Sequence, residues 1–472
     1  THAPKHTVRA CGLLVAMCAI VFGQSIQFDF VNWDDPWYVL NNELIHSWSF
    51  SNLLGICTET VTRNFAPLTI FSYLLDYTCW GEWAGGYHLT NLILHAVNAV
   101  LVFLLVRQVT QRHVFSLLVA ILFAIHPVQV ESVVWISARK GLLCSTFTLG
   151  SLLYWLKRER TSTDELCGTG LFVIALLCKA SAVVLPGIVL LYDWQVRNRS
   201  LFDALARQFV GGLIAVWFIL LTAGSQNSQT GGIRHHLELS KLELIGIDTV
   251  LLWKYIAMLI WPENLAILYD PPVSGIGLLI ALSTCGWLAV IIIAWRIRVQ
   301  NPFPLFALGS ALMLMVPVLN LFPLTTLMND RYLYLPCIGL FAVLLGLVER
   351  ITKTIWNSLP ANRPIPFAWV GVSAGILVVW FSSLTMSQLR HWENDQALWA
   401  QAAQVSPELP LVQYQYGIAL WNRGEHQAAI ERITQALSLP RVDELDRERF
   451  SEKLHLYQQH SLENLQVDAT VE

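Results

Sequence analysis

The stretch FDFVNWDDPWYVLNN, residues 28–42, opens a polar and aromatic segment that separates two apolar runs. The first run covers residues 8–26 and the second covers residues 87–106. Apolar runs of about 18 residues or more are typical of transmembrane helices. We therefore predict a large loop over residues 27–86, held between two membrane crossings.

The composition extends this prediction to most of the chain. Of its 472 residues, 55% are hydrophobic and only 13% are charged, and the mean hydropathy is +0.51. Soluble domains carry about 25% charged residues. We predict an all-α, polytopic protein in contact with membrane lipid, with about eleven transmembrane helices. The net charge of −3 gives no sign of a nucleic-acid partner.

Basic residues set the expected orientation. Lys5 and Arg9 place the N-terminus in the cytoplasm by the positive-inside rule, so the loop over residues 27–86 is expected outside. No small-residue cleavage site follows the first apolar run, so we interpret it as a retained span and not as a signal peptide. The predicted cytoplasmic turns hold Arg107/Arg112, Lys157 to Arg160, Arg197/Arg199, Arg296/Arg298 and Arg350/Lys353, and the outer loops hold Asp35, Glu131, Lys179, His235 and Arg331.

Two segments depart from simple spans. Residues 166–194 are too long for one span and are interrupted at Lys179, so we predict a hairpin with its tip near this lysine. A crossing by Leu244–Trp261 would place Arg296 and Arg298 outside, against the charge rule. We therefore expect Leu244–Trp261 to form a helix that lies in, or re-enters, the outer leaflet.

The chain changes character after residue 387. We predict a membrane domain over residues 1–387 and an extracytoplasmic helical tail over residues 388–472, which is less hydrophobic. One tetratricopeptide repeat cannot bury a core alone. The tail should therefore lean on the membrane domain or on a protein partner. The repeat spacing is carried by Gly417, Leu420, Gly424, Ala429, Ile433, Ala436 and Pro440.

The adjacent carboxylates Asp34 and Asp35 are the candidate catalytic groups. At an outer membrane face, a carboxylate can take the proton from an acceptor hydroxyl or hold a cation. The alternative is a solvated loop pair or a helix N-cap. The dipeptide by itself leaves both interpretations open.

Four basic residues near the outer ends of spans are candidate phosphate ligands. Arg139 and Lys140 end the segment HPVQVESVVWISARK, Lys179 lies between apolar runs, and Arg331 precedes another span. Guanidinium and ammonium groups suit a phosphate or pyrophosphate anion. The alternatives are contact with lipid headgroups, a partner carboxylate in the bundle for Lys179, and a local ion pair between Asp330 and Arg331.

Histidines and a glutamate complete the candidate substrate pocket. His126 and Glu131 lie at the outer end of a span, and their spacing fits no zinc signature, so no metal ligand is predicted, with a divalent cation left open. One helical face after residue 86 is polar, and such faces point into the bundle or a wet cavity. Interhelical hydrogen bonding is the alternative. The residues on that face are His88, Asn91, His95 and Asn98.

The order of the motifs resembles that of one known family. The chain is similar to the GT-C superfamily of membrane glycosyltransferases, and within it to the tetratricopeptide-repeat proteins related to eukaryotic O-mannosyltransferases and to their bacterial counterparts. The similarity covers essentially the whole chain. The motifs are FVNWDDPWYVLNN (30–42), NFAPLTIFSYLLDY (64–77), YHLTNLILHAVNA (87–99), LFAIHPVQVESVVWISARKGLLC (122–144), LLCKASAVVLP (176–186), MNDRYLYLP (328–336) and the terminal repeat.

The resemblance implies an inverting glycosyltransferase. It implies transfer of a mannose-like sugar from a polyprenyl-phosphate donor to an acceptor hydroxyl of a protein or glycan, on the outer face of a bacterial inner (plasma) membrane. No cofactor beyond the lipid-linked sugar is implied. The paired acidic motif of the family falls on Asp34 and Asp35.

The chain also departs from the family pattern. The basic motif that usually ends Arg-Lys-Asp reads Arg139-Lys140-Gly141, and the eukaryotic Ser-Lys-Glu motif reads Cys178-Lys179-Ala180. These departures favour the alternative function, a non-catalytic membrane scaffold that recruits envelope or glycan-assembly partners through its tail. An enzyme must place the acidic pair and the basic residues around one pocket, whereas a scaffold need not.

Overall fold

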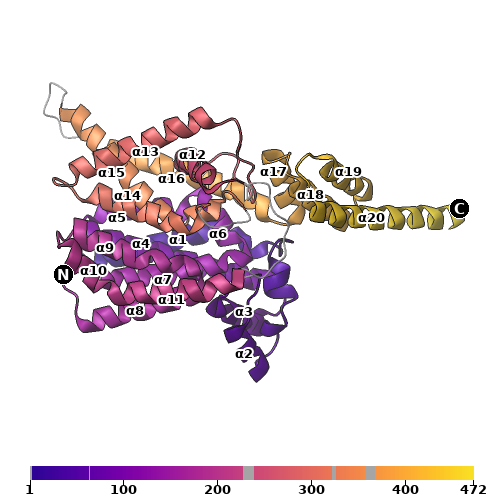
Figure 1. The fold of residues 1–472 in the computed structure, drawn as a ribbon, viewed down its shortest axis with the longest axis horizontal. Helices are drawn as coiled ribbons and strands as arrows, with labels where there is room; N and C mark the ends of the chain where they lie inside the picture. Colours follow the sequence, from indigo (N-terminus) through magenta and orange to yellow (C-terminus); the bar gives the residue numbers. More distant parts are fainter. Residues whose placement is uncertain (1–2, 63, 227–238, 321–325, 358–366, 472) are drawn as a thin grey trace.

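The computed structural model describes residues 3–62, 64–226, 239–320, 326–357 and 367–471, and within these ranges every regular element is a helix (Figure 1). Apart from helices, the described part of the chain contains one isolated bridge, between Val61 and Asn64. The all-α prediction is confirmed for these ranges. The expected outer loop with His235 lies outside the described residues.

The long helices lie side by side in a bundle that runs along the horizontal axis of Figure 1. Its interior is filled by side chains such as Leu14, Phe103, Phe123 and Phe172, all fully buried. The bundle helices are α1 (Ala3–Phe22), α4 (Ala84–Thr110), α5 (His113–Ile125), α7 (Arg139–Trp155), α8 (Ser162–Cys178), α9 (Leu185–Gln195), α11 (Phe209–Gln226), α13 (Gly277–Ile297), α14 (Phe303–Met315), α15 (Pro336–Asn357) and α16 (Phe367–Leu389). Helix α12 (Lys241–Ile260) is seen nearly end-on in Figure 1 and runs across the direction of the bundle.

Four helical segments among the described residues are long and apolar enough to cross a membrane: Lys5–Gln27, Ala84–Thr110, Gly277–Ile297 and Gly371–Trp392. Two bent helix pairs raise the number to six if each pair is one span. The protein is thus an all-helical, multi-pass membrane protein. The count of about eleven spans includes shorter helices and stays a prediction.

The predicted loop of residues 27–86 is folded. Pro67 occupies the first turn of α3, where its missing N–H costs nothing, and Ser49 caps α2 by accepting a hydrogen bond from the Asn52 amide (3.1 Å). A small separate core that includes Tyr38, Ile45 and Tyr73 fixes these pieces against each other. The loop elements are η2 (Pro36–Leu40), η3 (Glu43–Ile45), α2 (Phe50–Thr58) and α3 (Pro67–Trp80).

The structure largely agrees with the predictions for the two segments that depart from simple spans, residues 166–194 and Leu244–Trp261. Helix α8 ends at Cys178, Lys179 is extended (φ −162°, ψ 133°), and a short helix, η6 (Ala180–Val184), leads into α9. The predicted interruption at Lys179 is confirmed. Helix α12 covers the predicted helix Leu244–Trp261 and ends before Pro262. Its position relative to the membrane stays a prediction.

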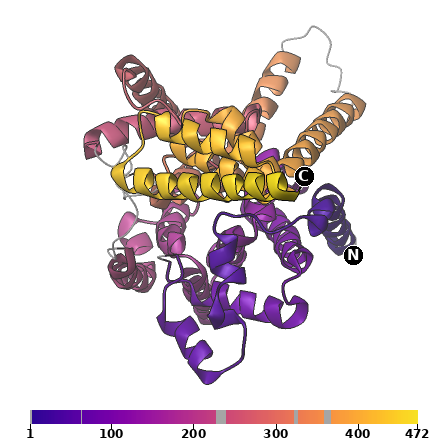
Figure 2. The ribbon, with the colours of Figure 1, turned by 90° about the vertical axis from the view of Figure 1, so that its right-hand side faces the viewer.

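Residues 388–471 form a helical tail at one end of the bundle (Figure 2), and its last helix extends away from the bundle in Figure 1. Gly417 permits the close approach of two of its helices, because a Cβ there would lie 2.7 Å from Ile433 Cγ1. Trp421 stacks on Tyr457 with ring centroids 3.7 Å apart. The tail helices are α17 (Asp395–Val405), α18 (Pro410–Asn422), α19 (His426–Ser438) and α20 (Glu444–Val471).

Ion pairs between charged residues lie at both ends of the bundle. At the N-terminal end, Arg112 pairs with Glu349 at 2.6 Å. At the other end, where α2, α3 and the tail lie in Figure 1, Lys140 approaches Asp34 to 3.8 Å. This separation agrees with the alternating topology, and the side that faces the cytoplasm stays a prediction.

Candidate active site

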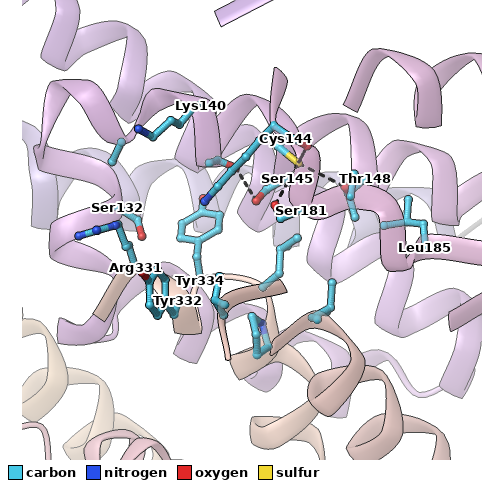
Figure 3. Close-up of a pocket in the computed structure, with 18 residues that line it drawn as sticks. Ser132, Lys140, Cys144, Ser145, Thr148, Ser181, Leu185, Arg331, Tyr332 and Tyr334 are labelled. Atoms are coloured by element: carbon cyan, nitrogen blue, oxygen red, sulfur yellow. Dashed lines mark hydrogen bonds between the residues drawn. The ribbon is translucent and has the colours of Figure 1, made fainter. Parts of the chain in front are cut away.

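A cavity lies at the end of the bundle that carries the folded loop, between α7, the break after α8 and the start of α15 (Figure 3). In Figure 3 the side chains of Lys140 and Arg331 extend on the same side of the cavity, and Leu185 lies at the opposite end. Three of the four predicted phosphate ligands line it, Lys140, Lys179 and Arg331. Hydroxyl-bearing residues complete the polar part: Ser132, Ser145, Thr148, Ser181, Tyr332 and Tyr334.

Lys179 reaches this cavity because the helix ends in front of it. An extended residue between α8 and η6 leaves the helical path, so its side chain can enter the gap between the helices. The break is tied to the folded loop, since the Thr69 hydroxyl donates a hydrogen bond to the Cys178 carbonyl (3.1 Å). The loop and the lysine therefore hold a fixed relation to each other.

Arg331 is oriented by Glu131. The Arg331 guanidinium pairs with the Glu131 carboxylate, and the Arg331 amide donates to the same carboxylate (2.8 Å). The guanidinium also lies over the Trp135 ring at 5.0 Å from its centroid. Glu131 is buried and does not line the cavity. The structure therefore makes it the partner of Arg331, in contrast to its predicted place in the substrate pocket.

Asp34 and Lys140 face each other at the edge of the cavity. Their charged atoms are 3.8 Å apart, and the side chains are 29% and 13% exposed. The Lys140 ammonium also donates to the Tyr38 hydroxyl (3.2 Å). Of the two adjacent aspartates, Asp34 is thus the one whose carboxylate is accessible, next to the cavity-lining Lys140.

Asp35 is buried and anchors the loop. Its carboxylate accepts hydrogen bonds from the Val31 amide (3.0 Å), the Ser137 amide (3.0 Å) and the Ser137 hydroxyl. Ser137 belongs to the turn that immediately precedes α7, so this contact fixes Asp34 next to Lys140. Both aspartates are candidate bases by sequence, and their surroundings in the structure separate them into an accessible carboxylate, Asp34, and an anchoring one, Asp35.

Burial raises the pKa of Asp35 to about 7, and the hydrogen bonds from Ser137 and Val31 only partly oppose this effect. The folded protein therefore binds a proton at Asp35 more strongly than the unfolded chain, in which the value is near 3.8. Stability from this group is fully present below the unfolded pKa and is lost as the pH rises through about 7.

We expect the melting temperature of the wild-type protein to fall between pH 5.5 and pH 8. The part of this pKa shift that lies between pH 5.5 and about 7 corresponds to a loss of stability on the order of 2 kcal/mol. Asp35→Asn should show a flatter profile, because the amide does not titrate. Melting curves of the purified protein at several pH values test this expectation, and equal slopes for the two proteins would contradict it.

Arg139, the fourth predicted phosphate ligand, points into the bundle. It is fully buried and pairs with Asp76 of α3 at 2.6 Å. It also donates to the Asn91 side chain and to the Tyr87 carbonyl, both at 2.9 Å. The structure thus corrects the prediction that Arg139 lines the cavity: its guanidinium fastens the folded loop to the bundle.

The three candidate histidines lie in the packing between helices. His95 contacts the Tyr334 hydroxyl (2.9 Å) and the Ala124 carbonyl (3.1 Å), and His126 contacts the Leu259 carbonyl (3.1 Å). His88 is 2% exposed and packs edge-on against Phe28. Their placement agrees with interhelical packing, the alternative interpretation, and corrects their assignment to the substrate pocket.

Sequence reasoning missed three residues that shape the site: Asp76, Ser137 and Tyr38. Asp76 was visible as an acidic residue in the otherwise apolar and aromatic segment TIFSYLLDY. Such a residue signals a buried charge partner. Ser137 and Tyr38 carry no comparable signal, because serine and tyrosine are common in loops.

Comparisons with known proteins agree with the resemblance of the motifs. The protein O-mannosyl-transferase F38B6.6 of Caenorhabditis elegans is 23% identical over 468 residues, which cover 93% of this chain and 64% of that protein. Human protein O-mannosyl-transferase TMTC1 is 28% identical over 211 residues, 39% of this chain and 23% of that protein. The chain therefore spans less than two thirds of the length of these relatives. No protein-family model matches the chain.

Among solved structures, ArnT from Cupriavidus metallidurans bound to undecaprenyl phosphate aligns with 90% of this chain and 75% of its own, at 15% identity and a TM-score of 0.40. The same protein in the apo state gives a TM-score of 0.43. By sequence, the chain is similar over 93% of its length to the protein O-mannosyl-transferase of Caenorhabditis elegans, and the predicted resemblance to that family is confirmed.

Proposed function

We propose that this protein is a GT-C glycosyltransferase that moves a mannose-like sugar from a polyprenyl-phosphate donor to an acceptor hydroxyl on the outer face of the membrane. The observation that carries the proposal is the convergence of Lys140, Lys179 and Arg331 on one cavity, with Asp34 at its edge. An enzyme needs an acidic group and basic groups around one pocket and a scaffold does not. Asp34 and the three basic residues meet this requirement, whereas Asp35 and Arg139 have structural partners instead. Similarity to protein O-mannosyl-transferases supports the same class of reaction.

The surroundings of the cavity fit a phosphate that carries a long apolar chain. An apolar groove between α4, α7, α9, α14 and α15 shares Thr148, Leu314 and Leu335 with the cavity. A polyprenyl chain that enters this groove from the bilayer stays in an apolar environment, and van der Waals packing against the groove can hold it there. The groove is lined, among others, by Leu105, Leu149, Leu152, Ile188, Phe303, Phe306 and Ile338.

In the proposed reaction, Asp34 takes the proton from the acceptor hydroxyl while the oxygen of that hydroxyl attacks the anomeric carbon of the donor sugar. The bond between that carbon and the phosphate oxygen breaks, and its electron pair leaves with the lipid phosphate. The three cations of the cavity stabilise the charge that develops on the phosphate. Attack opposite to the leaving group inverts the anomeric carbon. Asp34 and Lys140 separate when the sugar enters, since 3.8 Å is too short to hold a sugar ring between them.

Mass spectrometry of glycoproteins and glycolipids, from cells with and without the intact gene, tests the proposal. We expect a hexose-bearing species that disappears with the gene and returns with the wild-type copy, but not with Asp34→Asn. Restoration of this species by Asp34→Asn would contradict the mechanism. Restoration by a full-length variant that carries both Asp34→Asn and Lys179→Gln would favour the scaffold.

Lys179→Gln should weaken donor binding. The amide cannot make the charge-assisted contact with phosphate, which is worth about 1.5–3 kcal/mol, so the KM for the donor should rise by about 10- to 100-fold. Transfer from labelled undecaprenyl-phosphate mannose, measured at several donor concentrations, gives this value. Lys157→Gln is the matched control, since Lys157 pairs with Asp164 at the opposite end of the bundle. An unchanged KM for Lys179→Gln would remove Lys179 from the phosphate site.

A further inference from the structure

The tail contacts the segment that directly precedes the two aspartates. The Asp29 amide donates to the Glu393 carbonyl (3.1 Å), and the Asn32 amide donates to the Asp395 carboxylate. Trp399 of α17 is fully buried and packs edge-on against Trp33, the residue before Asp34.

This contact complements the anchor on the other side of Asp34. The Asp34 side chain contacts only the Lys140 ammonium among the described ion pairs, so its position is set by its backbone. That backbone is held at Asp35 by Ser137 and at Asn32 by Asp395. One of these anchors belongs to the turn that precedes α7, and the other belongs to the tail.

The tail also contacts the part of the membrane domain that supports Arg331. The Ser406 hydroxyl donates to the Leu268 carbonyl (3.1 Å). The next residue, Tyr269, donates through its hydroxyl to Asp330, which is buried and adjacent to Arg331. The same tail helix thus ends against the loop behind the phosphate site and begins against the loop that carries Asp34.

We infer that α17 is a positioning element of the active site, with Asp395 as the residue that holds the loop of Asp34 in place. This inference rests on the proposed function. Its physical reason is that a carboxylate acting on a hydroxyl must be held to within a fraction of an ångström, and a displacement of about 1 Å can cost 10²-fold in rate. The contacts of the tail with the membrane domain thereby acquire a role in the reaction itself.

The inference is tested with full-length protein and labelled undecaprenyl-phosphate mannose as the donor. Asp395→Ala removes the acceptor for the Asn32 amide and should lower kcat by about 10- to 100-fold, with the donor KM unchanged because the phosphate ligands are intact. Asp395→Asn keeps an acceptor oxygen and should recover most of the rate. Gln396→Ala is the control, since Gln396 contacts Glu425 within the tail (3.1 Å) and should transfer at the wild-type rate.

A second measurement separates positioning from loss of folding. In a background with the three exposed thiols removed (Cys57→Ser, Cys79→Ser, Cys285→Ser), Asn32→Cys and Asp395→Cys are combined. The reduced double variant should be slow, and oxidation, which ties loop and tail together, should raise its rate. A wild-type rate for Asp395→Ala, with Asp34→Asn inactive, would overturn the inference and leave the proposed function standing. Full transfer by Asp34→Asn would overturn both.

Discussion

Asp34→Asn is expected to lower the rate of sugar transfer by about 10²- to 10⁴-fold, the usual effect of removing a general base. The amide has nearly the same shape as the carboxylate but does not accept a proton. Because Asp34 is partly exposed at the edge of the cavity and Asp35 is buried, the larger loss is assigned to Asp34. Initial rates with labelled undecaprenyl-phosphate mannose, at saturating donor, measure the effect.

Asp35→Asn is the matched comparison. The asparagine oxygen can still accept from Ser137, so the loop keeps part of its anchor. We expect a smaller loss of rate than for Asp34→Asn. If Asp35→Asn is the more damaging change, the buried carboxylate is the base and the loop must move to expose it. If both variants transfer at the wild-type rate, the proposed mechanism is wrong.

Arg139→Met is expected to destabilise the protein by about 3–5 kcal/mol, because it leaves the Asp76 carboxylate without its partner in a buried site. Asp76→Asn should cost a similar amount for the complementary reason. Replacing both residues by apolar side chains, as in Arg139→Met with Asp76→Leu, should recover part of the loss, since buried ion pairs often exchange for apolar packing without penalty. Melting temperatures of the purified variants test this order.

The control is an ion pair at the surface. Lys353 pairs with Glu349 one helical turn away and is 67% exposed, so Lys353→Ala should change stability by less than about 0.5 kcal/mol. The opposite pattern is also informative. If Arg139→Met melts like the wild type but raises the donor KM as Lys179→Gln does, then Arg139 contacts phosphate, as its sequence motif predicted.

The pair Arg139–Asp76 also bears on the departure of this chain from the family motif. The family motif has an aspartate at the position of Gly141 in this chain. The absence of this aspartate is one of the departures that favour a scaffold function. In the structure a carboxylate for Arg139 is supplied by Asp76, from the folded loop. The missing residue therefore leaves no unpaired guanidinium.

The sequence alone determined the helical membrane fold, the place of the polar segment between two apolar runs, and the interruption at Lys179. Each of these depends on properties that neighbouring residues share. An apolar run predicts a buried or lipid-facing helix wherever it lies in the fold, and a lysine inside such a run must leave the helix or find a cavity. The sequence also indicated that the tail packs against either the membrane domain or a partner, because one repeat cannot bury its own apolar face, and the structure shows contacts with the membrane domain.

Only the tertiary structure decided which member of each charged pair faces the cavity. Arg139 and Lys140 are consecutive in a helix, so their side chains diverge by about 100°. One points to Asp76 and the other to Asp34. Asp34 and Asp35 divide in the same way between the cavity and Ser137. The tendency of an apolar segment to be buried depends on its own residues, so it can be predicted from the sequence. The partner of a charged side chain depends on which distant segment the fold brings beside it.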